Sequence, residues 1–487
     1  MTGSSGGGHP PPRCPAEREV PLPVAVRRVT TTLSALGLRA QLVDAGPGHD
    51  PSAWWCGLRG EADAAPLACG MGKGGRDEAR AGALFEAVEH YLTGSAGFAP
   101  EAVALAAPAD VAAGPLRDDV CGALLAPMGG HRMACARYRA IGGPKLGRDV
   151  LSGGGLSGGG LSGSDPRAGL SGVGRSGGIL GGGDMNGAGL DRAGLNGLGG
   201  GGVLVPLFLS APWYVEAGAA SLRELVGDRC DYADLMRYSC NSGSAIGVTV
   251  AEALLHALNE TIERDALSLL LVRVFLGGPG FRPRLIDPET LPDKPARAYA
   301  VARELTGSPV YLLDITSDLG VPTMLAYTLP TSRHPHRRGT GTSLSPSHAA
   351  WRALTELVQT TLGERLPADT HRDPAAPAAH PELYACARFD LAQALRDAHV
   401  VPFRGDVTAD GAPGDQLRTV VAVLAARGLT AYGRTVHALA SGVTVVHVFV
   451  PGLERFMLVT DGNLVIPGRR GRAAALSAPE NVSLPRL

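Results

Sequence analysis

The sequence predicts a mixed fold, of the α+β (mixed α/β) class, because two kinds of segment alternate along its 487 residues. Some segments have the apolar spacing of amphipathic helices, and others have the β-branched, alternating character of strands. Hydrophobic residues make up 45% of the chain, which is enough for a large core. Helices are expected at 27–38, 77–92, 252–274, 347–362 and 416–427, and strands at 310–316, 323–329 and 444–452.

The charge of the chain is balanced, with a formal net charge of -1. A chain of this kind has no overall field that would draw it to nucleic acid or to an anionic membrane surface. It also has no apolar run of transmembrane length, and its N-terminus lacks the layout of a signal peptide. We therefore expect a cytoplasmic protein with neither a nucleic-acid nor a membrane partner.

One segment interrupts the expected folded regions. From 142 to 202 the sequence is dominated by Gly, Ser and Leu. The whole chain has 68 glycines, and this segment holds many of them. Such a composition cannot repay the entropy of ordering and predicts a Gly-rich flexible insert. The insert separates a folded segment at 25–141 from a second one at 203–470, with a disordered N-terminal tail expected at 1–24 and a C-terminal tail at 471–487.

A short glutamate motif occurs three times outside the insert. It reads ALFEAVEH from Ala83, ALNETIER from Ala257 and ALTELVQT from Ala353. When each segment is drawn as a helix, its polar side chains fall on one narrow face, away from the apolar residues. The polar faces consist of Glu78, Glu86 and Glu89 in the first helix, Glu252, His256, Asn259, Glu260 and Glu263 in the second, and Arg352, Glu356 and Gln359 in the third.

These faces have two interpretations. Each could simply be a solvated surface, since most charged residues lie outside the core. Three matching copies favour a shared role, because glutamates three residues apart repel one another and a bound Mg²⁺ would relieve the repulsion. This ion takes carboxylates together with water and nucleotide phosphates. GMGKGG at 70–75 lacks the spacing of a P-loop, so a nucleotide would bind through the glutamate helices if they converge.

Several further blocks occur in a fixed order along the chain: Gly72-Lys73-Gly74 before ALFEAVEH, the segment Asn241 to Ala266, LLDITSDLGVPT, ALTELVQ, VPGLE and PGRR. In order and spacing these blocks resemble the YcaO family. The resemblance implies a YcaO-type fold in which sheets and packed helices converge carboxylates on a site for Mg²⁺ and ATP. It also implies an enzyme that activates a backbone amide of a ribosomally made peptide by O-phosphorylation. The product is an azoline when a Cys, Ser or Thr side chain is the nucleophile, and a thioamide when sulfide is.

The resemblance assigns binding roles to individual residues but leaves the catalytic residues unknown. The residues that match the Mg²⁺ and ATP carboxylates of the family are Glu86, Glu89, Glu260, Glu263 and Glu356. The further residues that match ATP-binding positions are Lys73, Glu252, Arg264, Arg352 and Gln359. The chain departs from the family pattern at Gly82, where a serine is usual, at His90, where an arginine is usual, and at Asn241-Ser242, whose order is swapped.

The resemblance also implies partners. A precursor peptide would be the substrate, and because no separate leader-binding domain is visible, a substrate-recruiting or sulfur-delivery protein is expected to assist. A homodimer is compatible with the sequence. A second hypothesis is that the chain is a non-catalytic member of the family, a nucleotide-binding scaffold or regulatory protein, which would suit its departures from the pattern.

Overall fold

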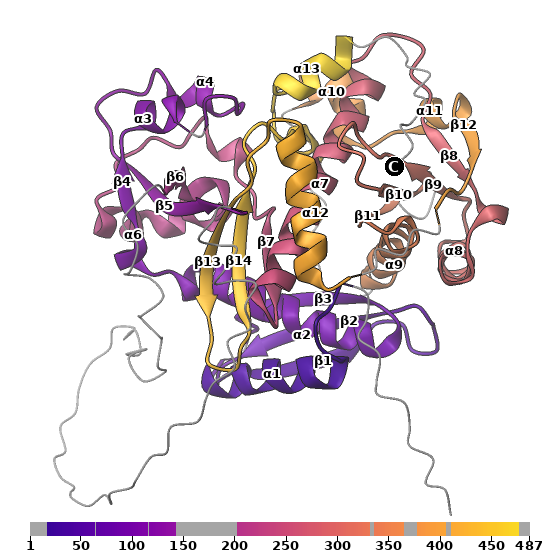
Figure 1. Cartoon of the computed structure of the whole chain (residues 1–487), viewed down its shortest axis with the longest axis horizontal. Coiled ribbons are helices and arrows are strands. Elements are labelled where there is room, and N and C mark those ends of the chain that lie inside the picture. Colours follow the sequence, from indigo (N-terminus) through magenta and orange to yellow (C-terminus); the bar gives the residue numbers. More distant parts are fainter. Residues whose placement is uncertain are drawn as a thin grey trace, which may run out of the picture.

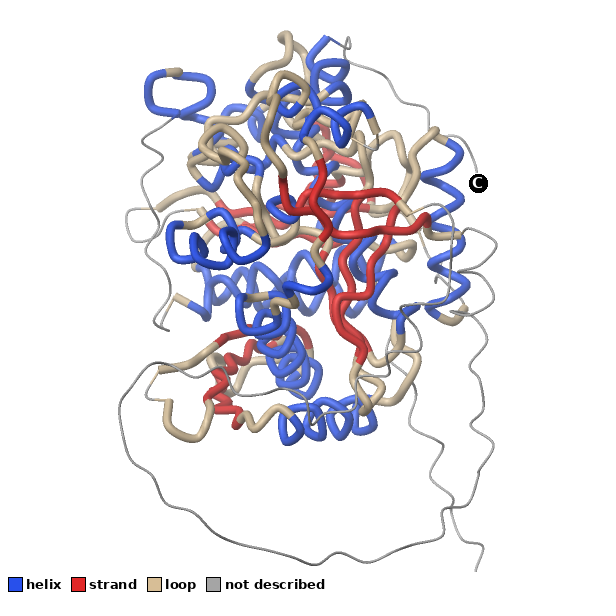
Figure 2. Tube along the Cα trace, turned by 90° about the vertical axis from the view of Figure 1, so that its left-hand side faces the viewer, coloured by secondary structure: helices blue, strands red, loops and turns tan. Residues whose placement is uncertain are grey.

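The computed structural model describes residues 17–142, 202–331, 336–364, 377–405 and 411–476, apart from residues 64 and 115. Within them the predicted mixed fold is confirmed, because helices surround three separate sheets (Figures 1 and 2). The predicted insert at 142–202 lies outside the described residues, except for its first and last residue. No helix in the described ranges is both long enough and apolar enough to cross a membrane.

The three sheets are mostly antiparallel. The first has the order β1-β2-β3, the second β11-β10-β9-β8-β12 with β12 parallel to β8, and the third β4-β5-β13-β14-β7 with β6 paired to β5. The strands are β1 (Arg39–Asp44), β2 (Ser52–Arg59), β3 (Ala68–Gly74), β4 (Ala104–Ala106), β5 (Met133–Ala140), β6 (Val203–Pro206), β7 (Ser244–Gly247), β8 (Arg284–Asp287), β9 (Val310–Asp314), β10 (Thr323–Thr328), β11 (Arg337–Thr342), β12 (His399–Pro402), β13 (Tyr432–Ala438) and β14 (Thr444–Phe449).

The five expected helices are present within a few residues of their expected ends. They correspond to α1, α2, α7, α9 and α12. Helix α1 begins at Leu22, inside the predicted N-terminal tail, and Pro23 is compatible with this start because a proline is tolerated in the first turn. The helices are α1 (Leu22–Ala35), α2 (Arg76–Thr93), α3 (Pro108–Ala113), α4 (Gly122–Leu125), α6 (Ala220–Val226), α7 (Val250–Phe275), α8 (Asp293–Thr306), α9 (Pro346–Gly363), α10 (Pro381–Ala387), α11 (Ala392–Arg396), α12 (Pro413–Ala426) and α13 (Arg469–Leu476).

Two strands lie directly against the helix that follows them because glycines face the helix. A Cβ atom at Gly72 of β3 would lie 1.8 Å from the carbonyl oxygen of Ala79 in α2. A Cβ atom at Gly341 of β11 would likewise lie 2.3 Å from the carbonyl oxygen of Ala349 in α9. Only glycine permits so close an approach of strand and helix backbones. Helices α2 and α9, which each carry a glutamate motif, are therefore held at a fixed distance from β3 and β11.

Helix α7 runs through the middle of the molecule (Figure 1). The side chain of Thr249 caps its first turn by accepting a hydrogen bond from the backbone N–H of Glu252, at 3.2 Å. Its apolar residues, such as Leu254, Leu258 and Ile262, are buried in a core shared with α12 and β14. The polar face of α7 is thereby directed toward α2 and α9, on which the other two motifs lie.

The structure places the two ends of the predicted insert next to each other. Tyr138 in β5 pairs with Val203 in antiparallel β6, so the strands on either side of the insert are adjacent. Two adjacent antiparallel strands need a connection of only about two to five residues. We therefore expect a variant in which residues 143–201 are replaced by a short Gly/Ser linker to keep its melting temperature and its nucleotide affinity. Loss of the folded state, measured by circular dichroism, would show that the insert contributes to packing.

A buried histidine predicts how stability depends on pH. His447 accepts or donates a hydrogen bond with the hydroxyl of Tyr138 at 2.9 Å, and burial, followed by the charge of Arg434, lowers its pKa to about 3. In the unfolded chain a histidine takes up a proton below about pH 6.5, but folded His447 stays neutral. The free energy of unfolding should therefore fall as the pH falls from about 6.5 toward about 3, at up to about 1.4 kcal/mol per pH unit for this group.

His447→Gln tests this expectation. The pH dependence of denaturant unfolding should become shallower in the variant between about pH 5 and 6.5, because the proton taken up by the unfolded parent is lost. His399→Gln, at an exposed position of β12, serves as the matched control. An unchanged slope in His447→Gln would contradict a neutral histidine at this position.

Candidate functional site

The three glutamate motifs converge, and their carboxylates interact. Burial raises the pKa of Glu89 well above its ordinary value, and the charges of Glu260 and Glu86 raise it further. Burial likewise raises the pKa of Glu260 to about 7, with Arg264 opposing the shift and Glu263 adding to it. Carboxylates on α2 and α7 are thus close enough to disfavour each other's ionisation. Such a cluster is stabilised by a bound cation.

Lys73 joins α9 to the cluster. Its ammonium group forms an ion pair with the carboxylate of Glu356, and both side chains are largely buried. Burial acts to raise the pKa of Glu356, but Lys73 outweighs it and holds that pKa below its usual range. On the next turn of α9, Gln359 donates a hydrogen bond from Nε2 to the carbonyl oxygen of Met71, at 2.7 Å. Helix α9 is therefore held against β3 by two residues of the motif.

The remaining carboxylate of the cluster is tied to β11. The hydroxyl of Thr340 donates a hydrogen bond to Oε1 of Glu263 at 2.6 Å, and the backbone N–H of Thr340 donates to Oε1 of Glu356 at 3.3 Å. Thr340 lies between Gly339 and Gly341, the glycines that bring β11 against α9. The sequence analysis missed Thr340, although its place in a Gly-Thr-Gly element before the third motif was a signal for it.

Three guanidinium groups surround the carboxylates. Arg264 lies 3.7 Å from Glu260, and Arg338 donates from Nη2 to the hydroxyl of Thr460 at 3.1 Å. The Nε atoms of Arg264 and Arg352 and the Nη1 atom of Arg338 are buried without a hydrogen-bond partner among the described residues. Buried donors of this kind normally have an acceptor. An anion with several oxygens, such as a polyphosphate, would supply the missing acceptors.

Glu252 lies apart from this cluster. Its buried carboxylate accepts a hydrogen bond from Nη1 of Arg18 at 2.6 Å and one from the backbone N–H of Glu19 at 3.3 Å. The preceding residue, Glu17, accepts hydrogen bonds from Ser343 at 2.5 Å and from Asn259 at 3.4 Å. Residues 17–19 thus contact the polar face of α7 from within the segment expected as a disordered tail. The role of Glu252 in ATP binding stays a prediction.

The residues present fit Mg²⁺ and a nucleotide together. Mg²⁺ takes one or two carboxylates and completes its coordination with water and phosphate oxygens, so it does not need a closed cage of protein ligands. In the described part of the chain, no group of three or more His, Cys, Asp or Glu side chains is placed to hold a metal ion by itself. The carboxylates of Glu86, Glu89, Glu260, Glu263 and Glu356 would hold the ion, and the unpaired guanidinium atoms would hold phosphate. These individual assignments remain predictions.

The three departures from the family pattern lie at or beside positions with close backbone contacts. A Cβ atom at Gly82 would lie 3.2 Å from the Cα atom of Gly72, so a side chain here would press on β3. His90 makes a hydrogen bond of 2.7 Å from Nδ1 to the carbonyl oxygen of Cys69, again on β3. After Asn241-Ser242, Gly243 has a φ angle of +91°, and a Cβ atom there would lie 2.3 Å from the carbonyl oxygen of Val448. The glycine that the turn requires is therefore retained.

The fold brings carboxylates from three helices together, which is the arrangement expected of a class of protein that binds Mg²⁺ and a nucleotide. A family model described as YcaO cyclodehydratase, ATP- and Mg²⁺-binding, matches residues 203–454, which is just over half of the chain. The chain belongs to the YcaO family, so the resemblance is confirmed, and with it the expectation of ATP and Mg²⁺ as the cofactors of the family.

Solved structures of the same fold agree with this assignment. YcaO from Methanopyrus kandleri, bound with AMPPCP and Mg²⁺, superimposes with a TM-score of 0.56 at 17% sequence identity and covers 96% of this chain and 97% of its own. A heterocyclase in complex with substrate and cofactor superimposes with a TM-score of 0.55, also at 17% identity, over 90% of this chain and 54% of its own. At this level of identity the likeness shows the fold.

Two relatives share a shorter stretch of sequence. An uncharacterized protein in the tfuA 3′ region of Rhizobium leguminosarum bv. trifolii is 33% identical over 130 residues, and one from Methanothermobacter thermautotrophicus is 36% identical over 124 residues. Each match covers 25% of this chain, and it spans only 30% and 31% of the length of these relatives.

Proposed function

We propose that this chain uses Mg²⁺ and ATP to activate a backbone amide of a ribosomally made precursor peptide. The observation that supports this proposal is the convergence of carboxylates from α2, α7 and α9 beside buried guanidinium atoms that lack acceptors. Membership in a family described as ATP- and Mg²⁺-binding cyclodehydratases supports the same reaction class.

The proposed reaction consists of addition to the amide, phosphoryl transfer and loss of phosphate. A side-chain thiol or hydroxyl, or sulfide, adds to the amide carbon, and the former carbonyl oxygen takes the γ-phosphoryl group from ATP as ADP leaves. The C–O bond then breaks and phosphate departs with that oxygen. In an azoline a C=N bond forms as the amide nitrogen loses its proton, and in a thioamide a C=S bond forms as the added sulfur loses its proton. ATP supplies the phosphoryl group, and Mg²⁺ neutralises phosphate charge when it is bound.

The residues of the chain would position and stabilise these groups. Arg264 and Arg352 would direct their unpaired Nε–H donors at phosphate oxygens, which present matching acceptors. Lys73 would keep Glu356 ionised and available as a ligand, which the lowered pKa of that carboxyl supports.

The partners remain proposals too. A precursor peptide would be the substrate, and a substrate-recruiting or sulfur-delivery protein would assist. A homodimer and a location in the cytoplasm stay predictions.

The test is to combine the purified chain with Mg²⁺, ATP and a candidate precursor peptide encoded beside its gene. An enzyme should release phosphate only when both the peptide and Mg²⁺ are present. In the mass spectrum of the peptide, loss of one water marks an azoline, and exchange of oxygen for sulfur after addition of sulfide marks a thioamide. Neither change would appear with the nucleotide analogue AMPPCP, which resists transfer of its terminal phosphoryl group.

A second candidate function is a nucleotide-binding scaffold without turnover. The departures at Gly82, His90 and Asn241-Ser242 favour it, because they change the loops and helix turn beside the carboxylates. Saturable binding of Mg²⁺-ATP with no phosphate release in the presence of peptide and partner proteins would support the scaffold and contradict the enzyme.

A further inference from the structure

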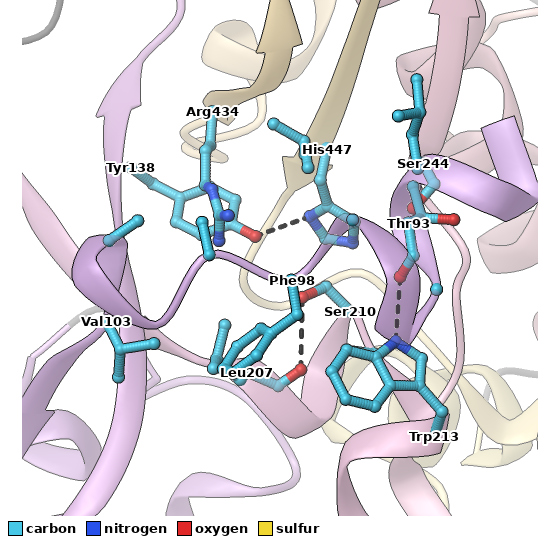
Figure 3. Close-up of a pocket in the computed structure, with 17 residues that line it drawn as sticks. Thr93, Phe98, Val103, Tyr138, Leu207, Ser210, Trp213, Ser244, Arg434 and His447 are labelled. Atoms are coloured by element: carbon cyan, nitrogen blue, oxygen red, sulfur yellow. Dashed lines mark hydrogen bonds between the residues drawn. The ribbon is translucent and has the colours of Figure 1, made fainter. Parts of the chain in front are cut away.

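A cavity lies at the C-terminal end of α2, between that helix and the sheet that contains β5, β13 and β14 (Figure 3). It encloses about 570 Å³ of space between atoms, including space open to solvent. None of the residues assigned to Mg²⁺ or ATP lines it. The lining residues are Leu92, Thr93, Gly94, Gly97, Phe98, Ala99, Ala102, Val103, Tyr138, Leu207, Ser210, Ala211, Trp213, Ser244, Arg434, Val436 and His447.

Side chains at the cavity offer hydrogen bonds to backbone carbonyl groups at the C-terminal end of α2. Trp213 donates a hydrogen bond from Nε1 to the carbonyl oxygen of Thr93 at 2.9 Å (Figure 3). Nε2 of His437 lies 3.1 Å from the carbonyl oxygens of both Leu92 and Gly97, to which it can donate. These donors occupy carbonyl groups that a helix end otherwise leaves free and offset its negative dipole. The cavity therefore does not present a bare negative helix end to a ligand.

Among the described residues that line the cavity, Arg434 is the one charged side chain. Tyr138 and His447 are neutral neighbours, since burial raises the pKa of the tyrosine and lowers that of the histidine to about 3. Among the residues that the structure describes, none forms a salt bridge with Arg434. Figure 3 shows its guanidinium group directed toward the hydroxyl of Tyr138. The cavity thus contains a positive charge without a charged counterpart.

The rest of the lining is mostly apolar. The rings of Phe98 and Trp213 pack edge to face with their centroids 5.4 Å apart. Val103 and Leu207 lie beside Phe98 on the side of the cavity away from Arg434 (Figure 3). A ligand that fits both parts would have an anionic head and a compact apolar body, because each part would then meet its own kind of surface.

We propose that this cavity binds a carboxylate that carries an apolar side chain, as found at the C-terminus of a peptide or in a free apolar amino acid. The carboxylate would pair with Arg434, whose planar donors suit two carboxylate oxygens. The side chain would lie against Phe98, Leu207 and Trp213. This inference is independent of the proposed function, because binding here needs neither ATP nor turnover.

The cavity is separate from the candidate site, but α2 and β7 contribute residues to both. Thr93 follows Glu89 by one turn of α2, and its hydroxyl donates to the carbonyl oxygen of Glu89 at 2.8 Å. Ser244, at the other wall, begins β7. Glu89 in turn accepts a hydrogen bond from the backbone of Ile246 in the same strand. A ligand in this cavity would therefore lie beside the elements that position Glu89.

The test is to titrate the full chain with each ligand in the absence of ATP and to measure binding by calorimetry or by ligand-observed NMR. The ligands are N-acetyl-L-leucine, its carboxamide and free L-leucine. N-acetyl-L-leucine should bind, and the carboxamide should bind at least about tenfold more weakly, because it lacks the charge that pairs with arginine. Stronger binding of N-acetyl-L-leucine than of leucine would identify a peptide C-terminus as the ligand, and the reverse order would identify a free amino acid.

Variants separate the site from general effects on the fold. Arg434→Gln should reduce the affinity for N-acetyl-L-leucine about tenfold or more, whereas Arg139→Gln, the same change at an exposed position of β5, should not. Ala102→Trp, at the exposed rim, should block the cavity while leaving Arg434 in place. Each variant should bind AMPPCP and Mg²⁺ as the parent does.

Two results would overturn the proposal. One is equal affinity of the parent for the acid and the carboxamide, or no binding of either at millimolar concentration. The other is binding of the acid that survives both Arg434→Gln and Ala102→Trp. Should Arg434→Gln fail to fold, the Ala102→Trp comparison still decides the question. Failure of the peptide-modification assay would not affect any of these measurements.

Discussion

Replacing Glu260 or Glu263 by glutamine is expected to abolish binding of Mg²⁺-ATP and to leave the fold intact. Both side chains lie on α7 in the carboxylate cluster, and Glu263 accepts its hydrogen bond from Thr340 at 2.6 Å. Glutamine keeps the shape and the acceptor oxygen but removes the negative charge that the metal requires. Calorimetry with AMPPCP, with and without Mg²⁺, measures the affinity, and circular dichroism measures the fold.

The control for this experiment is Glu304→Gln, the same change at an exposed position of α8. It should alter neither affinity nor melting temperature. If Glu260→Gln or Glu263→Gln instead lowers the melting temperature strongly and retains full affinity, the carboxylates are structural and the site lies elsewhere.

The second large effect is expected at Gly72, where β3 meets α2. In Gly72→Val the new Cβ atom would overlap the carbonyl oxygen of Ala79, which belongs to a helix backbone and cannot rotate away. The strand and the helix must then separate, so we expect the free energy of unfolding to fall by about 3 kcal/mol or more. Denaturant unfolding measures the change, and any folded variant should bind nucleotide weakly because α2 carries Glu86 and Glu89.

Gly218→Val is the comparison for Gly72→Val. Gly218 is exposed, and a Cβ atom there would have no neighbour within 4 Å. Its replacement should change the free energy of unfolding by no more than about 0.5 kcal/mol. Comparable losses in both variants would mean that valine itself, rather than the strand–helix contact, destabilises the chain.

The sequence predicted the elements whose signal is local. The motif helices repeat at the helical period over at least about four turns each, so their existence and their polar faces were predictable from spacing alone. The convergence of Glu86, Glu260 and Glu356 was only a hypothesis at that stage, since periodicity on each helix says nothing of how the helices pack. The family resemblance implied that the three carboxylates share one site, and the structure brings the three motifs together.

Residues whose contacts join distant parts of the chain could not be predicted from the sequence. Arg18 reaches Glu252 across 234 positions of the chain, and it lies in a segment whose composition resembled a tail. Arg338 stacks its guanidinium on the ring of Phe389, 4.4 Å from its centroid, and this contact has no periodic signal. The cavity around Arg434 could not be predicted either, because its lining comes from six stretches between positions 92 and 447. Only tertiary packing brings such residues together.

The origin of the carboxylates on three separate helices has a thermodynamic consequence. Glu89 and Glu356 belong to elements that meet only when the complete fold has formed, so the unfolded chain has no comparable ligand set. A ligand that binds only the folded state stabilises it by about 2.7 kcal/mol at 100 times its dissociation constant. Supply of nucleotide would then govern how long the chain resists unfolding and proteolysis, and a chain that met no nucleotide would be cleared sooner than its loaded counterpart.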